Sequence, residues 1–279
     1  MKISNTICLI SESSFFWETV SRLWLSLKID NDGVVYAALP GDNNNRGLIR
    51  VLDMEANVPG QTHLLKPSVI TNSISDLSSN SYFGEGLCIA GDYLFVTAHG
   101  NKTMGDNTGS IFIYKRYASG DFKDASGNDN ARGYKIVHGT LDTNVEPHKL
   151  IYLGKNGLIA AEGDYFVTSV GYYPTEGAGA RNAAVLFKKD ANDDWNRECY
   201  LDVGYGTTGT LYNLPGDLAI KNSQVIATGG GGAGLNIFNL SGERTQYFDT
   251  NPTLLRRQII MFASDDYLIT GYPPSTNEY

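Results

Sequence analysis

The sequence predicts an all-β protein: a single five-bladed β-propeller of four-stranded antiparallel blades that spans residues 1–279. Three observations predict this fold class. A hairpin pattern repeats five times, the repeats are spaced as propeller blades are, and the composition suits short strands joined by tight turns. The chain has 31 glycines and 17 tyrosines, and only 19% of its residues are charged. A ring of six or seven blades is the alternative architecture.

Five segments carry the hairpin pattern, which is a short apolar strand, a polar turn and a second apolar strand ending in small residues. They are WLSLKIDNDGVVYAALPG from Trp24, GLCIAGDYLFVTAHG from Gly86, GLIAAEGDYFVTSVG from Gly157, DLAIKNSQVIATGGG from Asp217 and QIIMFASDDYLITGYP from Gln258. The turn residues Asp32, Asp92, Asp164, Ser223 and Asp266 are 60, 72, 59 and 43 residues apart. Three of these intervals suit a four-stranded sheet, which needs roughly 40 to 60 residues, and the longest contains a Gly-, Asp- and Asn-rich insertion at 120–133 that is predicted to be a surface loop.

A third and a fourth strand are predicted after each of the first four hairpins. The third strands are GLIRVLDM, GSIFIYKR, NAAVLFKK and GLNIFNLSG, and the fourth are THLLKPSVI, HKLIYLG, RECYLDVG and RTQYFDT. The fifth hairpin is followed by neither, whereas the N-terminal NTICLISESSFFWETVSRL predicts a third and a fourth strand without a hairpin. We therefore expect a composite blade from about residues 3–24 plus 255–275, which closes the ring and removes free sheet edges.

One segment carries a family resemblance. The sequence YFGEGLCIAGDYLFVTAHGNKTMGDNTGSIFIYKR, Tyr82 to Arg116, resembles an FG-GAP repeat of the integrin-like type. Phe83 and Gly84 stand at the FG pair, Thr97 to Gly100 replaces the GAP element, and GSIFIYKR matches the usual Gly-x-Val-Tyr-Val-Tyr strand. The third repeat is similar to it, and the other three match in pattern only. The resemblance implies a β-propeller of a family whose members usually work outside cells.

The resemblance also raises the question of calcium, because integrin-like repeats carry Asp-x-Asp-x-Asp-Gly loops. The nearest strings here are DNDG at 30–33, DNNN at 42–45 and DASGNDN at 124–130, and none has the full ligand pattern. Asn and backbone carbonyls can bind hard cations, so the candidate calcium ligands are Asp30, Asp32, Asp42 and Asp124. The alternative, which the turn chemistry of Asp and Asn favours, is that the protein holds no metal and no cofactor.

No complete catalytic site stands out, so we predict that the protein is not an enzyme. Five-bladed propellers host glycosidases, which need carboxylates about 5 to 9.5 Å apart in the central funnel. The acidic residues here fall in turns, and the candidate inner strands SLKI, LCIA, LIAA, LAIK and IIMF are almost wholly apolar. The four histidines lack metal-ligand spacing, and GGGGAG at 229–234 leads into a strand instead of the helix that a phosphate loop needs. A glycan-active enzyme stays the alternative.

The candidate ligand contacts are one histidine and three tyrosines. His99 follows a hairpin strand directly, at a position where propellers often place ligand contacts. Tyr172 and Tyr173 follow the third hairpin and Tyr272 follows the fifth, so all three are expected in loops on one rim. Aromatic rings on a rim can stack against sugars or anchor a protein partner. The alternatives are an ordinary exposed histidine and aromatic packing between neighbouring blades.

Charge, hydropathy and cysteine content exclude several classes. A net charge of -8 and a pI near 5.0, without any cluster of Lys and Arg, argue against a nucleic-acid partner. No run of about 18 apolar residues exists, so no membrane insertion is predicted. The apolar patch 7–10 is too short for a convincing signal peptide. Cys8, Cys88 and Cys199 are odd in number and far apart, which excludes a disulfide framework.

Together these features predict a non-enzymatic binding, adhesion or structural display module. The expected partner is a protein or a surface glycan, and other subunits of a larger assembly are a further class of partner. The expected location is extracellular or on a virion surface, because a phage or viral appendage or a capsid-associated protein is assembled inside a cell and later exposed. A secreted integrin-like adhesion protein is the alternative.

Overall fold

The protein is all-β in the parts of the chain that the computed structural model describes. These are residues 26–29, 34–53, 77–106, 108–115, 135–139, 149–173, 181–203, 216–228, 234–248, 259–262 and 268–271. In these ranges the only helical elements are α1 (Asp42–Asn45) and the short 3-10 helix η1 (Lys155–Gly157). No helix in them is long and apolar enough to cross a membrane. The predicted all-β class is confirmed.

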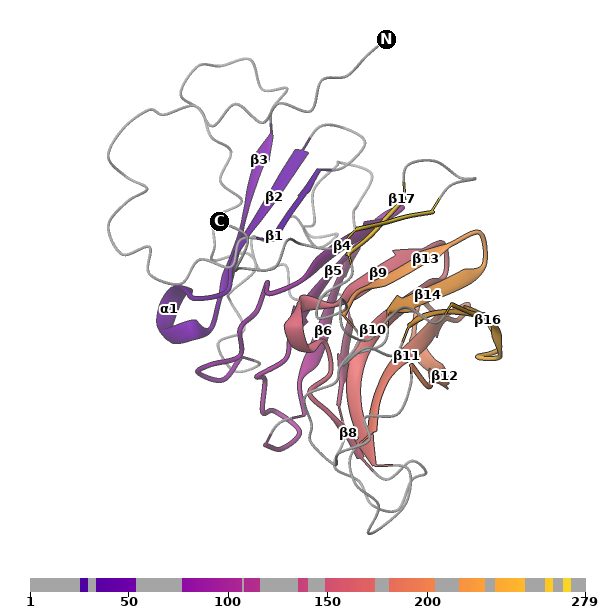
Figure 1. The fold of residues 1–279 in the computed structure, drawn as a ribbon. Coiled ribbons are helices and arrows are strands. Elements are labelled where there is room, and N and C mark those ends of the chain that lie inside the picture. Colours follow the sequence, from indigo (N-terminus) through magenta and orange to yellow (C-terminus); the bar gives the residue numbers. More distant parts are fainter. Residues whose placement is uncertain are drawn as a thin grey trace, which may run out of the picture.

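The described strands form five separate antiparallel sheets, which follow one another in chain order (Figure 1). The first sheet consists of β1 (Ser26–Ile29), β2 (Val34–Leu39) and β3 (Leu48–Asp53). The second consists of β4 (Leu87–Ala90), β5 (Tyr93–Ala98), β6 (Ser110–Lys115) and β7 (Lys135–His138). The third consists of β8 (Lys149–Ile151), β9 (Ile159–Glu162), β10 (Tyr165–Tyr173), β11 (Arg181–Lys189) and β12 (Trp195–Leu201).

The fourth and fifth sheets complete the described part. The fourth consists of β13 (Leu218–Lys221), β14 (Gln224–Thr228), β15 (Leu235–Asn239) and β16 (Arg244–Phe248), and the fifth of β17 (Ile259–Phe262) and β18 (Leu268–Gly271). The predicted composite blade lies largely outside the described residues. Its N-terminal half, 3–24, is not described, and β17 and β18 are the described part of its C-terminal half. The number of blades therefore stays a prediction.

All five predicted hairpins are confirmed as antiparallel strand pairs, namely β1–β2, β4–β5, β9–β10, β13–β14 and β17–β18. Three of them have two-residue turns: Gly91–Asp92, Gly163–Asp164 and Asn222–Ser223. Such short turns need a positive φ, which glycine adopts without cost and asparagine tolerates. Accordingly, φ is 54° at Gly91, 57° at Gly163 and 51° at Asn222.

The third strands are confirmed as β3, β6, β11 and β15, and two of the fourth strands are confirmed as β12 and β16. The predicted fourth strand THLLKPSVI lies outside the described residues. The prediction for HKLIYLG is wrong. Its residues Lys149–Ile151 form β8, which pairs with the far end of β10. β10 has nine residues and β5 has six, so the end of β10 is free to take a further partner. The outer strand of the second sheet is instead β7, which pairs with β6.

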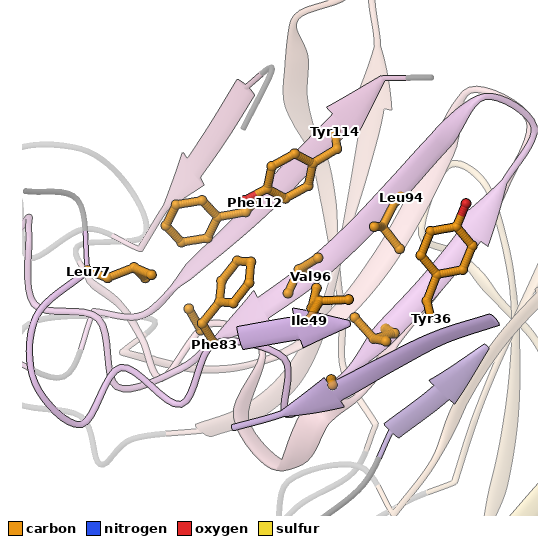
Figure 2. Close-up of a cluster of buried hydrophobic side chains, with 11 residues drawn as sticks. Tyr36, Ile49, Leu77, Phe83, Leu94, Val96, Phe112 and Tyr114 are labelled. Carbon is orange, nitrogen blue, oxygen red and sulfur yellow. The ribbon is translucent and has the colours of Figure 1, made fainter. Parts of the chain in front are cut away.

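The first four sheets are packed face to face in succession through their apolar side chains. Figure 2 shows the cluster between the first and second sheets, in which Tyr36 and Ile49 meet Phe83, Leu94 and Phe112. Aromatic rings fill the space between the second and third sheets, where the centroids of neighbouring rings among Phe95, Phe166, Phe187 and Trp195 are 4.6 to 5.3 Å apart. A third cluster joins the third and fourth sheets. The first strands of four hairpins, β1, β4, β9 and β13, are neighbours in that order.

The two ends of the sheets carry different kinds of connection. One end, termed the hairpin end, carries the two-residue turns and the turns 190–194 and 239–243. The other, termed the connection end, carries the loops 40–47 and 99–109 and the lead-in turns 82–85 and 152–155, which precede β4 and β9. Because the sheets are aligned, side chains from neighbouring sheets meet at the same end.

Candidate functional site

The candidate site is centred on the lead-in turn before β4, which has the sequence Tyr-Phe-Gly-Glu. The Glu85 amide donates a hydrogen bond of 3.1 Å to the Tyr82 carbonyl, which closes the turn. The Tyr82 and Phe83 amides donate to the carbonyls of Asn45 and Arg46 at 2.8 and 3.0 Å, so the turn is fixed to the first sheet. The Phe83 ring is fully buried between the sheets (Figure 2), which anchors the turn in the core.

His99 joins this turn from the end of β5. The backbones of Gly86 and Thr97 are hydrogen-bonded at 3.0 Å, which brings the start of β4 beside the end of β5. The His99 ring stacks on the Tyr82 ring with centroids 5.0 Å apart and an interplanar angle of 6°. Its Nδ1 lies 2.5 Å from Oε2 of Glu85, and the two side chains are 18% and 24% exposed. The structure therefore assembles an aromatic pair and a carboxylate at the connection end, all partly open to solvent.

Several buried polar atoms gather at this junction. In the described residues, four buried side-chain nitrogen or oxygen atoms lack a hydrogen bond, and three of them are Arg46 Nε, Glu85 Oε2 and His99 Nδ1. The Glu85 and His99 atoms nonetheless lie 2.5 Å apart and face each other, although their alignment is not that of a hydrogen bond. Arg46 belongs to the loop that the turn is bonded to. The junction thus concentrates polar groups whose bonding capacity is incompletely used.

The predicted ligand contacts are not all found together. His99 belongs to the cluster, as described. Tyr172 and Tyr173 were expected in a loop, and that expectation is wrong: they continue β10, where Tyr172 pairs with Leu150 and Tyr173 with Lys149 of β8. The length of β10 explains the difference, because a partner strand is present where the repeat pattern predicted a turn. Tyr272 lies outside the described residues.

The calcium candidates are mostly outside the described residues as well. This applies to Asp30, Asp32 and Asp124, so their role stays a prediction. Asp42 begins the four-residue helix α1. Within the described ranges, no group of three or more His, Cys, Asp or Glu side chains is arranged to hold a metal ion.

Sequence inspection missed a serine–histidine pair in the second sheet. Ser110 Oγ and His138 Nδ1 are 2.8 Å apart across the β6–β7 pair, and Asn101 Nδ2 donates to Ser110 Oγ at 3.0 Å. Ser110 and Asn101 are fully buried. A substrate therefore has no access to the serine oxygen, and the three side chains satisfy one another within the fold. The pair escaped notice because its members are far apart in the chain and meet only through strand pairing.

A second polar cluster joins the second and third sheets at the hairpin end. Asp193 accepts hydrogen bonds from the Tyr93 hydroxyl at 2.7 Å and from Lys115 Nζ at 2.5 Å. Lys189 Nζ lies 3.0 Å from Asp164 and 3.5 Å from Asp193. The ammonium groups of Lys189 and Lys115 also lie over the Tyr93 ring, at 4.9 and 5.6 Å from its centroid. Every group in this cluster has a partner of opposite charge or a hydrogen bond.

These contacts shift the pKa values in the cluster in the directions that favour the charged forms of Asp193 and Lys189. The hydrogen bonds from Lys115 and Tyr93 hold the pKa of Asp193 well below its usual range. Burial raises the pKa of the Tyr93 hydroxyl, and the hydrogen bond to Asp193 adds to this. Desolvation alone would lower the pKa of Lys189, but its hydrogen bonds to Asp164 and Tyr93 outweigh that effect and raise it. The charged forms of Asp193 and Lys189 are thus stabilised.

The signal that could have located the site in the sequence lies beside the FG pair. Phe83 and Gly84 carry the resemblance, while the half-buried residues that flank them, Tyr82 and Glu85, contact His99. Neither the comparison with models of protein families nor that with curated protein sequences finds a match for this chain.

Proposed function

We propose that this chain is a five-bladed β-propeller that acts as a non-enzymatic binding module and contacts a protein or a surface glycan through its connection end. The succession of antiparallel sheets with neighbouring first strands supports the ring. The composite closing blade from the two ends of the chain supplies its fifth member in this proposal. A closed ring is a rigid support on which loops can form a recognition face.

The observation that carries the functional proposal is the cluster of Tyr82, His99 and Glu85. It combines an aromatic stack with a carboxylate and an imidazole, and its side chains are partly exposed. Aromatic faces with adjacent hydrogen-bonding groups are suited to sugar rings and to anchoring side chains of a protein. The cluster contains a potential proton carrier but no activated nucleophile, so binding is the function it supports best.

The proposed setting is an exposed virion component or another extracellular assembly. The FG-GAP-like segment supports an extracellular role, and the acidic net charge favours solubility at an exposed surface. In such an assembly other subunits would contact the hairpin end or the outer strands, and the connection end would face the ligand.

The experiment that tests this function is a glycan array probed with the labelled full chain, combined with mass spectrometry of the incubated glycans. We expect binding to a subset of glycans without cleavage. His99→Ala should reduce binding about tenfold, because it removes both the stack on Tyr82 and the imidazole that faces Glu85. Asp92→Ala, an exposed turn residue at the hairpin end, is the matched control and should bind as the unmodified chain does.

Two results would contradict the proposal. Cleavage of the glycans, abolished by changing one carboxylate, would establish the glycan-active enzyme instead. Equal loss of binding in His99→Ala and Asp92→Ala would show that the connection end is not the binding face. Binding of a protein partner in place of a glycan, with the same dependence on His99, would keep the binding module and change its ligand.

A further inference from the structure

The lead-in turn of the candidate site has a structural copy before β9, with the sequence Tyr-Leu-Gly-Lys. The Lys155 amide donates to the Tyr152 carbonyl at 3.0 Å, as the Glu85 amide does to the Tyr82 carbonyl at 3.1 Å. The glycine of each turn has a positive φ, 94° at Gly84 and 79° at Gly154. Tyr82 and Tyr152 therefore occupy equivalent positions in neighbouring sheets.

Their surroundings repeat as well. Each glycine amide donates at 2.9 Å to the carbonyl at the matching place in the hairpin, which is Thr97 for Gly84 and Ser169 for Gly154. The two turns belong to sheets that touch, because a Cβ placed on Gly86 would lie only 2.0 Å from the Gly157 carbonyl oxygen. The two tyrosines are thus held at the same end of the molecule by adjoining sheets.

Both tyrosines adopt a backbone conformation that bulky residues rarely take. Their φ angles are 54° and 56°, in the left-handed region where a Cβ is crowded and where glycine or asparagine is the usual choice. Such strain persists where the surroundings impose it, and it concentrates at ligand-binding sites. The two equivalent positions therefore each place an aromatic residue in a strained backbone conformation.

Each ring has a polar companion on the surface. Tyr82 stacks on His99, which is paired with Glu85. Lys155 Nζ lies over the Tyr152 ring, 4.3 Å from its centroid. Both tyrosines are half-buried. The two sites differ in charge, since the first carries a carboxylate and an imidazole and the second an ammonium group.

We propose that Tyr82 and Tyr152 are two matched subsites that hold successive parts of one carbohydrate chain. This inference rests on the proposed function and names its ligand class. A sugar ring presents a face of C–H groups that stacks on an aromatic ring, and hydroxyl groups at its edge that bond to polar neighbours. Glu85 and His99 would accept or donate to hydroxyls at the first subsite. Lys155 would pair with a carboxylate or sulfate carried by a sugar at the second.

The linked arrangement has a measurable consequence. A glycan long enough to reach both subsites gains affinity from the second contact, because that contact is intramolecular once the first has formed. A short glycan occupies one subsite only. Affinity should therefore rise with chain length in the unmodified protein, and this rise should vanish when either ring is removed.

The experiment uses the full chain on an array of neutral and acidic glycans that range from single sugars to long oligosaccharides. Tyr82→Asn and Tyr152→Asn each delete one ring, and asparagine suits the left-handed backbone, so both variants should fold. The matched control is Tyr247→Asn, which removes an exposed tyrosine paired with Arg244 on β16. Each test variant should lose about tenfold affinity for the long acidic glycans, and the control should lose none. Circular dichroism tests whether all variants are folded.

The outcomes separate this inference from the proposed function. If the unmodified chain binds glycans and both ring deletions bind equally well, the subsites are wrong while the binding module stands. If only Tyr82→Asn loses affinity for the long glycans, the site has a single ring and the proposal of two matched subsites is wrong. If the unmodified chain binds an immobilised protein or peptide and no glycan, the carbohydrate inference fails. Binding that rises with length and drops in both variants supports it.

Discussion

Tyrosine has opposite roles at the two ends of the second and third sheets. At the hairpin end Tyr93 is 6% exposed, its hydroxyl bonds to Asp193, and two lysines cover its ring. At the connection end Tyr82 and Tyr152 are half-buried residues in strained turns. A tyrosine whose hydroxyl and ring are both satisfied inside the protein stabilises an interface between sheets. The strained, half-buried tyrosines at the connection end are the ones that we propose to bind a ligand.

The largest difference between the two ends should come from glycine substitutions. A Cβ on Gly47, at the connection end, would lie 2.0 Å from the Phe83 carbonyl oxygen, and its φ is +87°. A Cβ on Gly91, at the hairpin end, would meet nothing within 4 Å, although its φ is +54°. We expect Gly47→Ala to lower the free energy of unfolding by at least about 3 kcal/mol, and Gly91→Ala by about 1 kcal/mol.

Chemical denaturation of the two variants measures this difference. Both carry the strain of a positive φ, so the excess loss in Gly47→Ala reports the close contact between the first and second sheets. Equal losses would mean that the backbone at the connection end shifts easily, and the Tyr82 site would then lack the rigid support that we assign to it.

A substitution in the polar cluster around Asp193 at the hairpin end should have the next largest effect on stability. Asp193→Asn keeps a residue that tolerates the observed φ of 61° but removes the charge facing Lys115 and Lys189. We expect a loss of about 1 to 2 kcal/mol in the free energy of unfolding. Asp106→Asn is the control, because Asp106 forms an exposed pair with Lys102, and it should change stability by less than about 0.5 kcal/mol.

The same variant makes a prediction about pH. The pKa of Asp193 is lower in the folded protein than in the unfolded chain, so its stabilisation is complete above the usual Asp pKa of about 4 and is lost as the pH falls below it. The stability gap between the unmodified chain and Asp193→Asn should therefore be constant from about pH 5 to pH 8 and shrink in more acid solution. Denaturation curves across this range check it, and a gap that grows on acidification would contradict the assignment.

The sequence predicted the hairpins and third strands because each is encoded locally by alternation and by Gly, Asp or Asn in the turn. It failed where pairing depends on length and register. β8 was assigned to the second sheet because KLI resembles an outer strand, but its partner is determined by the extra length of β10. The extra length of β10 includes Tyr172 and Tyr173, so both lie in a strand and not in the predicted loop. Only three-dimensional packing decides such cases.

The sequence predicted only part of the candidate site, again because the rest depends on three-dimensional packing. His99 was identified from its place after a hairpin strand, but its companions lie on a different segment and meet it through the closure of β4 on β5. Tyr152 could not be identified from the sequence alone, because its likeness to Tyr82 consists of backbone angles and hydrogen bonds. The sequence Tyr-x-Gly is present at both sites and is the local signal that they share.

The smallest effect on stability should come from deleting a ring at the connection end. Tyr82→Asn loses the stack on His99 but relieves the strain of an aromatic residue at φ 54°, and the two terms are each about 1 kcal/mol. We expect a net change within about 0.5 kcal/mol. Tyr93→Phe removes a single oxygen at the hairpin end, yet it should cost about 1 to 2 kcal/mol because Asp193 loses a hydrogen bond. Thermal and chemical denaturation of both variants decide the order. If Tyr82→Asn proves the more damaging, the Tyr82 ring contributes to the interface between sheets as Tyr93 does, and the division of roles between the two ends is wrong.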